Sequence, residues 1–271
     1  MTEAAEQVGG ESAQRRPGGV AVVIPAKDEA ERIAGTIQAA FLIDGADLVV
    51  VVDDGSTDAT VAVAAAAGAQ VISHEHNRGK AAAMETGAAR VAELEAETEL
   101  DADATSRPPR ALLFIDADLG TTATAAAMLA EPVLAGEADM TIALLPPQKT
   151  AGGGSGRVVR LARKGIRKAT GWTAIQPLSG TRCVNRPAFQ QALPLAPGWG
   201  VETGLTIDLL AAGYRVIEVP CELHHRVTGT DFTAQLHRAR QYRDVWLALL
   251  ARRAGPAWTA PLTIRIPTRR A

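Results

Sequence analysis

ALLFIDADLG, residues 111–120, is an apolar run that ends in two carboxylates, Asp116 and Asp118, with one alanine between them. A short apolar run bounded by polar residues is typical of a strand that is buried on both faces. Such strands occur mainly in parallel sheets that are covered by helices. This stretch therefore predicts an α/β fold, with its two aspartates at the carboxyl end of a central strand.

The same pattern continues on both sides of this stretch. Further β-branched runs occupy 20–25, 48–55, 69–73 and 139–144. Ala-rich stretches typical of helices lie beside these runs, at 29–41, 57–67, 79–95 and 122–134. Alternating strands and helices predict a Rossmann-like, mostly parallel central sheet with helices on both faces.

Polar residues gather where the predicted strands end. In sheets of this kind, ligands bind outside the carboxyl ends of the strands. The residues at this edge are Pro25, Asp28 and Glu29 after the first strand, Asp53 and Asp54 after the second, and Asp116 and Asp118 after the fourth. We therefore expect the functional site along this edge.

The spacing of Asp116 and Asp118 suits a hard divalent cation, which prefers oxygen ligands. Mg²⁺ or Mn²⁺ held there would neutralise the negative charge that develops on a departing nucleoside diphosphate. Carboxylates two positions apart are also common on ordinary protein surfaces, so the pair alone is weak evidence for a metal site.

The motif DDGSTDAT, residues 53–60, follows the second strand. An ordinary strand-to-helix turn explains Gly55 as the tight turn, Ser56 or Thr57 as the N-cap and Asp58 as a first-turn residue. Such a turn does not explain the two carboxylates at the start of the motif. A carboxylate accepts hydrogen bonds from a base or ribose, so Asp53 is a candidate to recognise uridine.

In NRGKAAAM, residues 77–84, Arg78 and Lys80 flank Gly79 at a predicted helix start. Backbone N–H groups and cations at a helix start can face a phosphate. Charged residues around a glycine are more often simply solvated, and that alternative stays open.

The composition limits the class of function. The 271 residues include 28 Lys and Arg against 30 Asp and Glu, and a net charge of −2 gives no general attraction to nucleic acid. No run of eighteen strongly apolar residues and no export signal occurs, and Cys183 and Cys221 are expected as separate buried thiols. We therefore expect a cytoplasmic protein with a disordered arm at 1–17, one domain at 18–253 and a tail at 254–271.

Four motifs together resemble the nucleotide-sugar half of family 2 glycosyltransferases of the GT-A fold. They are VVIPAKDEAERI at 22–33, VVVVDDGSTDAT at 49–60, RGKAAAM at 78–84 and FIDADL at 114–119. Four segments farther along resemble the glucosyl-3-phosphoglycerate synthases, which are retaining enzymes. These segments are GGGSGRV at 152–158, IQPLSGTRC at 175–183, LAPGWGVETGLTID at 195–208 and CELHHRV at 221–227. The resemblance runs from about Val20 to Leu250 and implies a GT-A fold and a UDP-sugar donor.

The resemblance also implies roles for individual residues. The donor nucleotide would contact Pro25, Ala26, Asp28, Glu29, Asp53, Lys80, Asp116 and Ala117. Mg²⁺ or Mn²⁺ would be held by Asp116, Asp118 and His225, and the acceptor by Gly156, Arg157, Ser179 and Gly180. Glu202 and Asp118 would be the catalytic residues.

Alternatives stay open for three residues near the predicted site. Adjacent strand residues face opposite sides, so His224 and His225 cannot both reach the metal, and the His-Arg pair of the family favours His225. Glu202 would contact sugar hydroxyls in a retaining enzyme or act as general base in an inverting one, and it would equally suit the dipole of a helix start. Trp199 could form a wall beside the hexose, but we favour a place in the core.

The acceptor half departs from the synthase pattern. Val159 stands where the synthases have a threonine, Val227 where they have an asparagine, and TRC at 181–183 replaces a Glu-Tyr pair. A site built to pair polar groups discriminates strongly when those groups change. We therefore expect the donor chemistry to be retained and the acceptor to be a small anionic molecule other than 3-phosphoglycerate.

The sequence thus predicts a metal-dependent glycosyltransferase that moves a hexose, with glucose favoured, from a UDP-sugar to a small anionic acceptor with retention. Two alternatives stay open, an inverting polyprenyl-phosphate sugar synthase and a nucleotide-sugar-binding module without turnover. The amphipathic helix expected at 232–252 carries four arginines, so peripheral contact with a membrane is an alternative to packing on its own domain, which we favour. A homodimer also stays open, and no nucleic-acid partner is expected.

Overall fold

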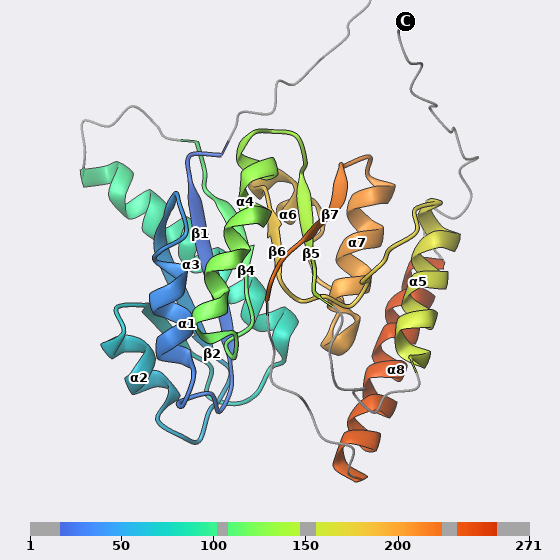
Figure 1. The fold of residues 1–271 in the computed structure, drawn as a ribbon, viewed down its shortest axis with the longest axis horizontal. Coiled ribbons are helices and arrows are strands. Elements are labelled where there is room, and N and C mark those ends of the chain that lie inside the picture. The colour runs from blue at the N-terminus through green and yellow to red at the C-terminus, as the bar shows by residue number, and fades with distance from the viewer. Residues whose placement is uncertain (1–16, 102–107, 147–155, 224–231, 254–271) are drawn as a thin grey trace, which may run out of the picture.

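The computed structural model describes residues 17–101, 108–146, 156–223 and 232–253. These residues form a seven-stranded sheet with helices packed on both faces (Figure 1). Among them, no helix is both long and apolar enough to cross a membrane. The division into arm, domain and tail, like the cytoplasmic location and the homodimer, stays a prediction.

The sheet is mixed, with the strand order β3-β2-β1-β4-β6-β5-β7. Its strands are β1 (Val20–Ala26), β2 (Ala46–Asp53), β3 (Gln70–Ser73), β4 (Ala111–Phe114), β5 (Met140–Leu144), β6 (Arg182–Val184) and β7 (Val216–Pro220). The pairs β1–β2, β1–β4, β2–β3 and β5–β7 are parallel, whereas β6 runs antiparallel to β4 and β5. The predicted mostly parallel sheet is confirmed. The direction of β6 was not predicted, because a strand of three residues has too little periodicity to reveal its neighbours.

Helices cover both faces of this sheet. They are α1 (Ile33–Ala40), α2 (Thr60–Ala66), α3 (Lys80–Asp101), α4 (Ala127–Leu134), α5 (Arg157–Thr170), α6 (Arg186–Gln191), α7 (Val201–Ala211) and α8 (Phe232–Arg253), with 3₁₀ turns η1 (Gly120–Ala126) and η2 (Gly198–Gly200). Alternate strand residues face opposite layers. In β1, Val22 and Ile24 pack in a core with residues of α1 and α4, whereas Val23 packs in a core with residues of α3 and α7. The predicted helices on both faces are confirmed.

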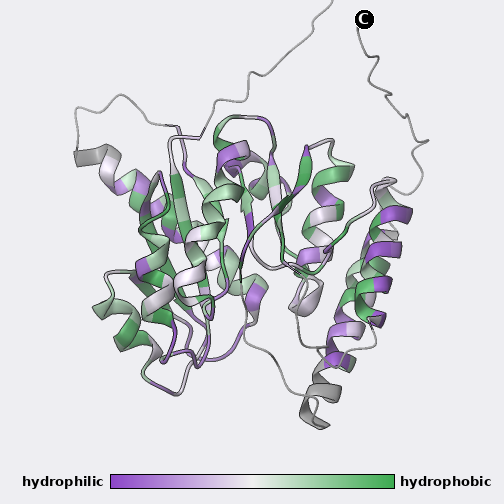
Figure 2. Ribbon diagram, viewed as in Figure 1, coloured by the Kyte–Doolittle hydropathy of each residue, from purple (hydrophilic) through white to green (hydrophobic). Residues whose placement is uncertain are grey.

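A third, smaller core joins α5, α7 and α8. It contains Ala162, Ile166, Ile207, Val245 and Leu249. Figure 1 shows α5 and α8 beyond α7, at the end of the molecule opposite α2. Figure 2 shows hydrophobic colour along the central strands, while α5 has one hydrophilic and one hydrophobic side. The late helix therefore packs on its own domain, as favoured from the sequence.

Neither Ser56 nor Thr57 of the motif after β2 is the N-cap of the next helix. Helix α2 begins at Thr60, so the N-cap predicted at 56–57 is wrong. The hydroxyl of Ser56 instead accepts a hydrogen bond from the N–H of Asp28 at 2.8 Å. The carboxylate of Asp58 accepts hydrogen bonds from the N–H groups of Ala30 and Thr60 at 3.1 and 2.9 Å. These residues tie the loop after β2 to the loop after β1, which fixes one end of the sheet's carboxyl edge.

Two helices also differ from their predicted lengths. Helix α3 extends to Asp101 instead of ending near 95. Arg90 forms exposed ion pairs with Glu93 and Glu97 at 3.0 and 3.1 Å, which link successive turns of this helix. The helix predicted at 122–134 is divided into the 3₁₀ turn η1 and helix α4.

Candidate active site

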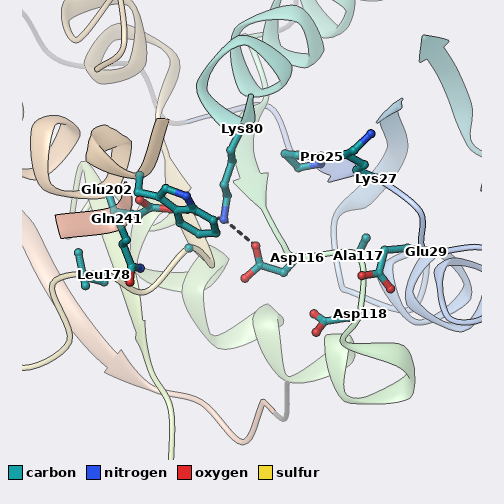
Figure 3. A pocket seen from close by; sticks show the side chains of 12 residues that line it. Pro25, Lys27, Glu29, Lys80, Asp116, Ala117, Asp118, Leu178, Glu202 and Gln241 are labelled. Carbon is teal, nitrogen blue, oxygen red and sulfur yellow. Dashed lines mark hydrogen bonds and ion pairs between the residues drawn. The ribbon is translucent and has the colours of Figure 1, made fainter. Parts of the chain in front are cut away.

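A cavity of about 320 Å³ lies at the carboxyl ends of β1 and β4. Its lining residues are Pro25, Lys27, Glu29, Lys80, Asp116, Ala117, Asp118, Leu178, Gly180, Trp199, Glu202 and Gln241. Figure 3 shows Lys80 and Asp116 between two groups of side chains, with Glu202, Gln241 and Leu178 on one side and Pro25, Lys27, Glu29 and Asp118 on the other. The structure therefore brings eight of the residues predicted for the site into one cavity, across 177 positions of sequence from Pro25 to Glu202.

Lys80 carries a positive charge between two carboxylates. Its Nζ lies 2.6 Å from Oδ1 of Asp116 and 3.4 Å from Oε1 of Glu202. Burial alone would lower the pKa of Lys80, but the two neighbouring carboxylates outweigh burial and raise that pKa above its usual value. Lys80 is therefore a cation at neutral pH, placed between Asp116, which follows β4, and Glu202, in the first turn of α7.

Gly180 lets this charged group assemble. A Cβ atom at residue 180 would collide with Nζ of Lys80 and would lie 3.1 Å from both carboxylate oxygens of Asp116. Glycine thus leaves room for this close approach, because a side chain at residue 180 would push the lysine away from its aspartate.

Asp116 and Asp118 both line the cavity, one on each side of Ala117. Two carboxylates and a nearby phosphate are a donor set that suits Mg²⁺ or Mn²⁺, ions that keep several water or phosphate oxygens among their ligands. Within the described residues, no three potential ligand side chains form a cluster. His225, the predicted third ligand, and His224 lie outside the described residues. The residues present fit such an ion, and the metal role stays a prediction.

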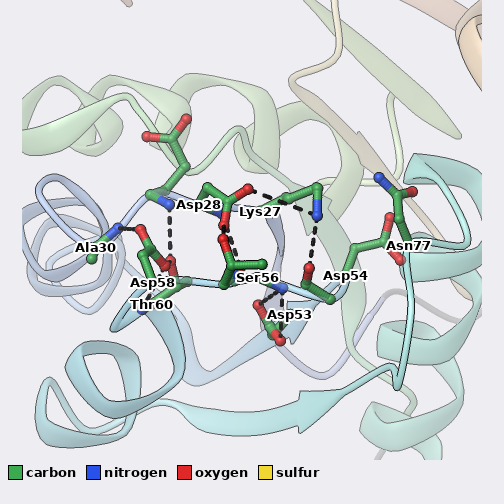
Figure 4. Close-up of polar contacts among 12 residues, drawn as sticks. Lys27, Asp28, Ala30, Asp53, Asp54, Ser56, Asp58, Thr60 and Asn77 are labelled. Carbon is green, nitrogen blue, oxygen red and sulfur yellow. Dashed lines mark hydrogen bonds and ion pairs between the residues drawn. The ribbon is translucent and has the colours of Figure 1, made fainter.

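Three residues predicted to contact the donor lie outside the lining of the cavity: Ala26, Asp28 and Asp53. Asp28 has a positive φ of 54°, and its carboxylate accepts hydrogen bonds from the N–H and hydroxyl of Thr57 at 2.7 and 3.2 Å. The hydrogen bond from the N–H of Thr57 lowers the pKa of Asp28. Asp53 is buried and accepts a hydrogen bond from the N–H of Ser56 at 3.2 Å. Asp28 joins the two loops, whereas Asp53 stabilises the turn of its own loop (Figure 4), and the roles of both carboxylates toward a donor stay predictions.

Asp54 has a structural role that the sequence did not reveal. Its carboxylate accepts hydrogen bonds from the N–H groups of Arg78 and Gly79 at 2.7 and 2.8 Å and lies 2.8 Å from Nδ1 of His74. The backbone N–H groups considered as a phosphate cradle are thus directed at a protein carboxylate. Burial would raise the pKa of Asp54, but these hydrogen bonds outweigh burial and lower it. Asp54 therefore fixes the start of α3, and so the position of Lys80.

Four cavity residues were missed or misjudged. Trp199 lines the cavity and is 37% exposed, so the favoured place in the core is wrong. Its backbone N–H donates a hydrogen bond to Asp244 of α8 at 3.3 Å. Gln241 reaches the cavity from α8, and no motif in the sequence signals its arrival. Lys27 lies inside a quoted motif and Leu178 beside Gly180, but neither residue type marks a site by itself.

The residues predicted for the acceptor are not all at the cavity. Gly180 lines it, whereas Ser179, Gly156 and Arg157 do not. Ser179 is buried, and its hydroxyl has no hydrogen-bond partner among the described residues. Gly156 precedes α5 with φ of 61°, and Arg157 begins that helix with an exposed side chain. Their roles toward an acceptor stay predictions.

Comparisons with known proteins agree with this geometry. Residues 21–190 match the family described as Glycosyl transferase family 2. A curated glucosyl-3-phosphoglycerate synthase of Mycobacterium tuberculosis is 33% identical over 205 residues. That alignment covers 70% of this chain and 60% of the relative, so the chain spans less than two thirds of the relative's length.

Two solved structures of the glucosyl-3-phosphoglycerate synthase from Mycobacterium tuberculosis share this fold. The complex with Mn²⁺, UDP-glucose and phosphoglyceric acid has a TM-score of 0.65 and 30% identity, covering 90% of this chain and 81% of that chain. The complex with Mg²⁺ and UDP has a TM-score of 0.65 and 30% identity, covering 86% of this chain and 79% of that chain. Because the family match covers more than half of the chain and the fold is similar to that of these structures, the chain belongs to glycosyl transferase family 2.

Proposed function

We propose that the protein is a metal-dependent glycosyltransferase that moves a hexose, with glucose as the first candidate, from a UDP-sugar to a small anionic acceptor with retention. The observation that carries the proposal is the single cavity in which Asp116, Lys80 and Glu202 are joined by ion pairs and Asp118 stands alongside. A binding module without turnover has no need for this whole set.

Each residue of the cavity has a task in this proposal. Asp116 and Asp118 would hold Mg²⁺ or Mn²⁺, which neutralises charge on the leaving diphosphate when bound. Burial lowers the pKa of Lys80, but its two carboxylate neighbours raise that pKa by more. Lys80 therefore stays cationic and adds positive charge beside Asp116. Glu202 would accept hydrogen bonds from sugar hydroxyls and orient the hexose. In an inverting reaction the same carboxylate would instead take the proton of the acceptor hydroxyl.

The acceptor is proposed to differ from the phosphoglyceric acid seen in the related synthase. The exposed guanidinium of Arg157, at the start of α5, is a bidentate donor for a carboxylate or phosphate. Val159 follows it on the same helix, where the synthases offer a hydroxyl. An unpaired polar group on a ligand costs about 1–3 kcal/mol, which is roughly one to two orders of magnitude in affinity.

A donor and acceptor screen tests this function directly. UDP release would be measured for a series of UDP-sugars with Mn²⁺ or Mg²⁺, with and without acceptors that include 3-phosphoglycerate and other small phosphates and carboxylates. We expect UDP release to require the metal and to rise with an anionic acceptor, and the anomeric proton of the product to report retention. Absence of UDP release with every donor would reject the proposal, and efficient transfer to 3-phosphoglycerate would reject its acceptor part.

A further inference from the structure

Arg182 is an arginine in the middle of the sheet. It lies on β6, opposite Phe114 of β4 and Ile142 of β5, and is 1% exposed. Placing an isolated charge in such surroundings is costly unless hydrogen bonds replace its water. Burial lowers the pKa of Arg182 to about 10, so the guanidinium keeps its proton at neutral pH.

The hydrogen bonds of Arg182 all go to uncharged oxygen atoms. Its Nε donates to the carbonyl of Ser179 at 2.8 Å, and its Nη2 donates to the carbonyl of Pro177 at 3.1 Å. Its Nη1 donates to the carbonyl of Glu202 at 3.0 Å and to the hydroxyl of Thr206 at 2.8 Å. Among the described residues, no carboxylate forms an ion pair with this guanidinium. Four of the five N–H groups of the arginine are thus used on the protein's own backbone and one hydroxyl.

These partners belong to the two segments that close the cavity on one side. The carbonyls of Pro177 and Ser179 flank Leu178 and lead into Gly180, and both of these lining residues face the cavity. The carbonyl of Glu202 and the hydroxyl of Thr206 are in the first turns of α7. One planar side chain therefore joins the segment that packs on Lys80 and Asp116 to the helix that carries Glu202.

We propose that Arg182 is a positioning residue of the transfer reaction, which holds Glu202 against Lys80 without contacting the substrates. It is absent from the lining of the cavity, and four of its five N–H groups already bond to the protein. The inference rests on the proposed function. A lysine at this place keeps the charge but has one nitrogen in place of the planar fork, so it cannot span both segments.

The test compares Arg182→Lys with Val184→Ala. Val184 is on the same strand and the same face of the sheet as Arg182, is fully buried in the core that contains Phe189 and does not line the cavity, so its truncation destabilises β6 without removing the guanidinium's hydrogen bonds. We expect Arg182→Lys to lower kcat by roughly tenfold to a hundredfold, the range caused by small misplacements of reacting groups. The affinity for UDP with Mn²⁺, measured by calorimetry, should stay within about twofold, since the guanidinium's hydrogen bonds go to Pro177, Ser179, Glu202 and Thr206 and to no residue of β1, β2, β4 or α3 among those described.

Backbone hydrogen exchange gives a second readout that does not need turnover. In Arg182→Lys, exchange should accelerate in 176–181 and 201–206 but not in 78–84, whereas Val184→Ala should not show this selectivity. The inference would be overturned if both variants lost the same factor in kcat at the same loss of Tm. It would also be overturned if Arg182→Lys left hydrogen exchange in the two segments unchanged. Weakened UDP binding in Arg182→Lys would also overturn it. A wild-type protein that releases no UDP would reject the proposed function, while the exchange pattern would still decide whether Arg182 holds Glu202 in place.

Discussion

Lys80 connects two carboxylates that come from different halves of the chain. Asp116 follows β4 in the half that carries the nucleotide motifs, and Glu202 begins α7 in the other half. Removing one member of a partly buried charged group leaves the others without compensation. The position of this lysine is therefore a sensitive point of the cavity, and Gly180 controls it.

Gly180→Ala should lower turnover without unfolding the protein. The added Cβ would collide with Nζ of Lys80 and approach both oxygens of Asp116, which separates the ion pair. We expect kcat to fall by roughly tenfold or more, because overpacking of this kind costs about 1–3 kcal/mol. Gly35→Ala, in α1, is the matched control, since a Cβ there would make only an ordinary contact of 3.6 Å with the Cα of Gly120. The measurement is the steady-state kinetics of both variants, together with their Tm values. An equal loss of kcat in the two variants would contradict the prediction.

Asp118→Ala should weaken metal-dependent binding of UDP. Loss of one of the two carboxylates leaves the diphosphate charge less well neutralised. We expect the Kd for UDP with Mn²⁺ to rise at least about tenfold, which corresponds to about 1.4 kcal/mol. Asp47→Ala is the control, because Asp47 pairs with Arg110 and does not line this cavity. Calorimetry that finds an unchanged Kd in Asp118→Ala would remove Asp118 from the metal site.

The residues of the cavity were predictable where they end a strand. Asp116, Asp118 and Glu29 follow apolar runs, and parallel neighbours necessarily bring such ends to one edge. Trp199 and Gln241 were not predictable in this way. They reach the cavity because α8 packs on η2, where a Cβ on Gly200 would lie only 2.8 Å from the carbonyl of Asp244. That contact depends on tertiary packing across many residues, which no local pattern encodes.

At the scale of elements, Asp54 joins three of them. Its carboxylate receives hydrogen bonds from the start of α3 and lies beside His74, which follows β3, while Asp54 itself follows β2. Nε2 of His74 in turn lies 3.0 Å from the hydroxyl of Thr86 in α3. The same kind of contact between loops explains the wrong start predicted for α2, since Ser56 bonds to the loop after β1, and Asp58 bonds both to that loop and to Thr60 at the start of α2. Strands were predicted from their β-branched runs, but helix starts depend on partners distant in sequence.

Asp54→Asn should destabilise the protein in a pH-dependent way. The pKa of Asp54 is lowered in the folded protein, because hydrogen bonds from Arg78, His74 and Gly79 outweigh the effect of burial. Because the pKa is lower in the folded than in the unfolded protein, the ionised carboxylate stabilises the fold at pH values above 3.8, the ordinary pKa of an aspartate. This stabilisation is lost as the pH falls through the pKa of the folded protein. We expect a loss of about 1.5–3 kcal/mol in the free energy of unfolding at pH 7, as for hydrogen bonds to a charged group. Urea unfolding that shows the same difference between wild type and variant at pH 7 and pH 3 would contradict this account.

At the scale of the whole molecule, the residues that line the cavity come from two parts of the fold. The parallel strands β3, β2, β1 and β4, with α3, place Pro25, Lys80, Asp116 and Asp118. The reversed strand β6 and the small core of α5, α7 and α8 place Gly180, Glu202 and Gln241. The small core shares Trp172 and Leu210 with the large core beneath α3, and α7 contributes residues to both cores, whereas the residues that α5 and α8 contribute to the cores belong to the small core. A change in the small core should therefore affect one side of the cavity more than the other.

Leu249→Ala tests this division. Leu249 is 2% exposed and packs in the small core, where α8 contacts Gly165 of α5 so closely that an added Cβ would collide with the leucine. Truncating a buried leucine costs about 2–5 kcal/mol, and here the loss loosens the helix that carries Gln241 and supports η2. We expect kcat to fall severalfold or more while the Kd for UDP with Mn²⁺ stays within about twofold.

Leu129→Ala is the control, since Leu129 is equally buried in the core between α4 and the sheet. Measured at a temperature where both variants are fully folded, Leu129→Ala should keep its kcat. If the two variants lose kcat and UDP affinity in the same proportion, the cavity responds to the fold as one unit and the division is wrong.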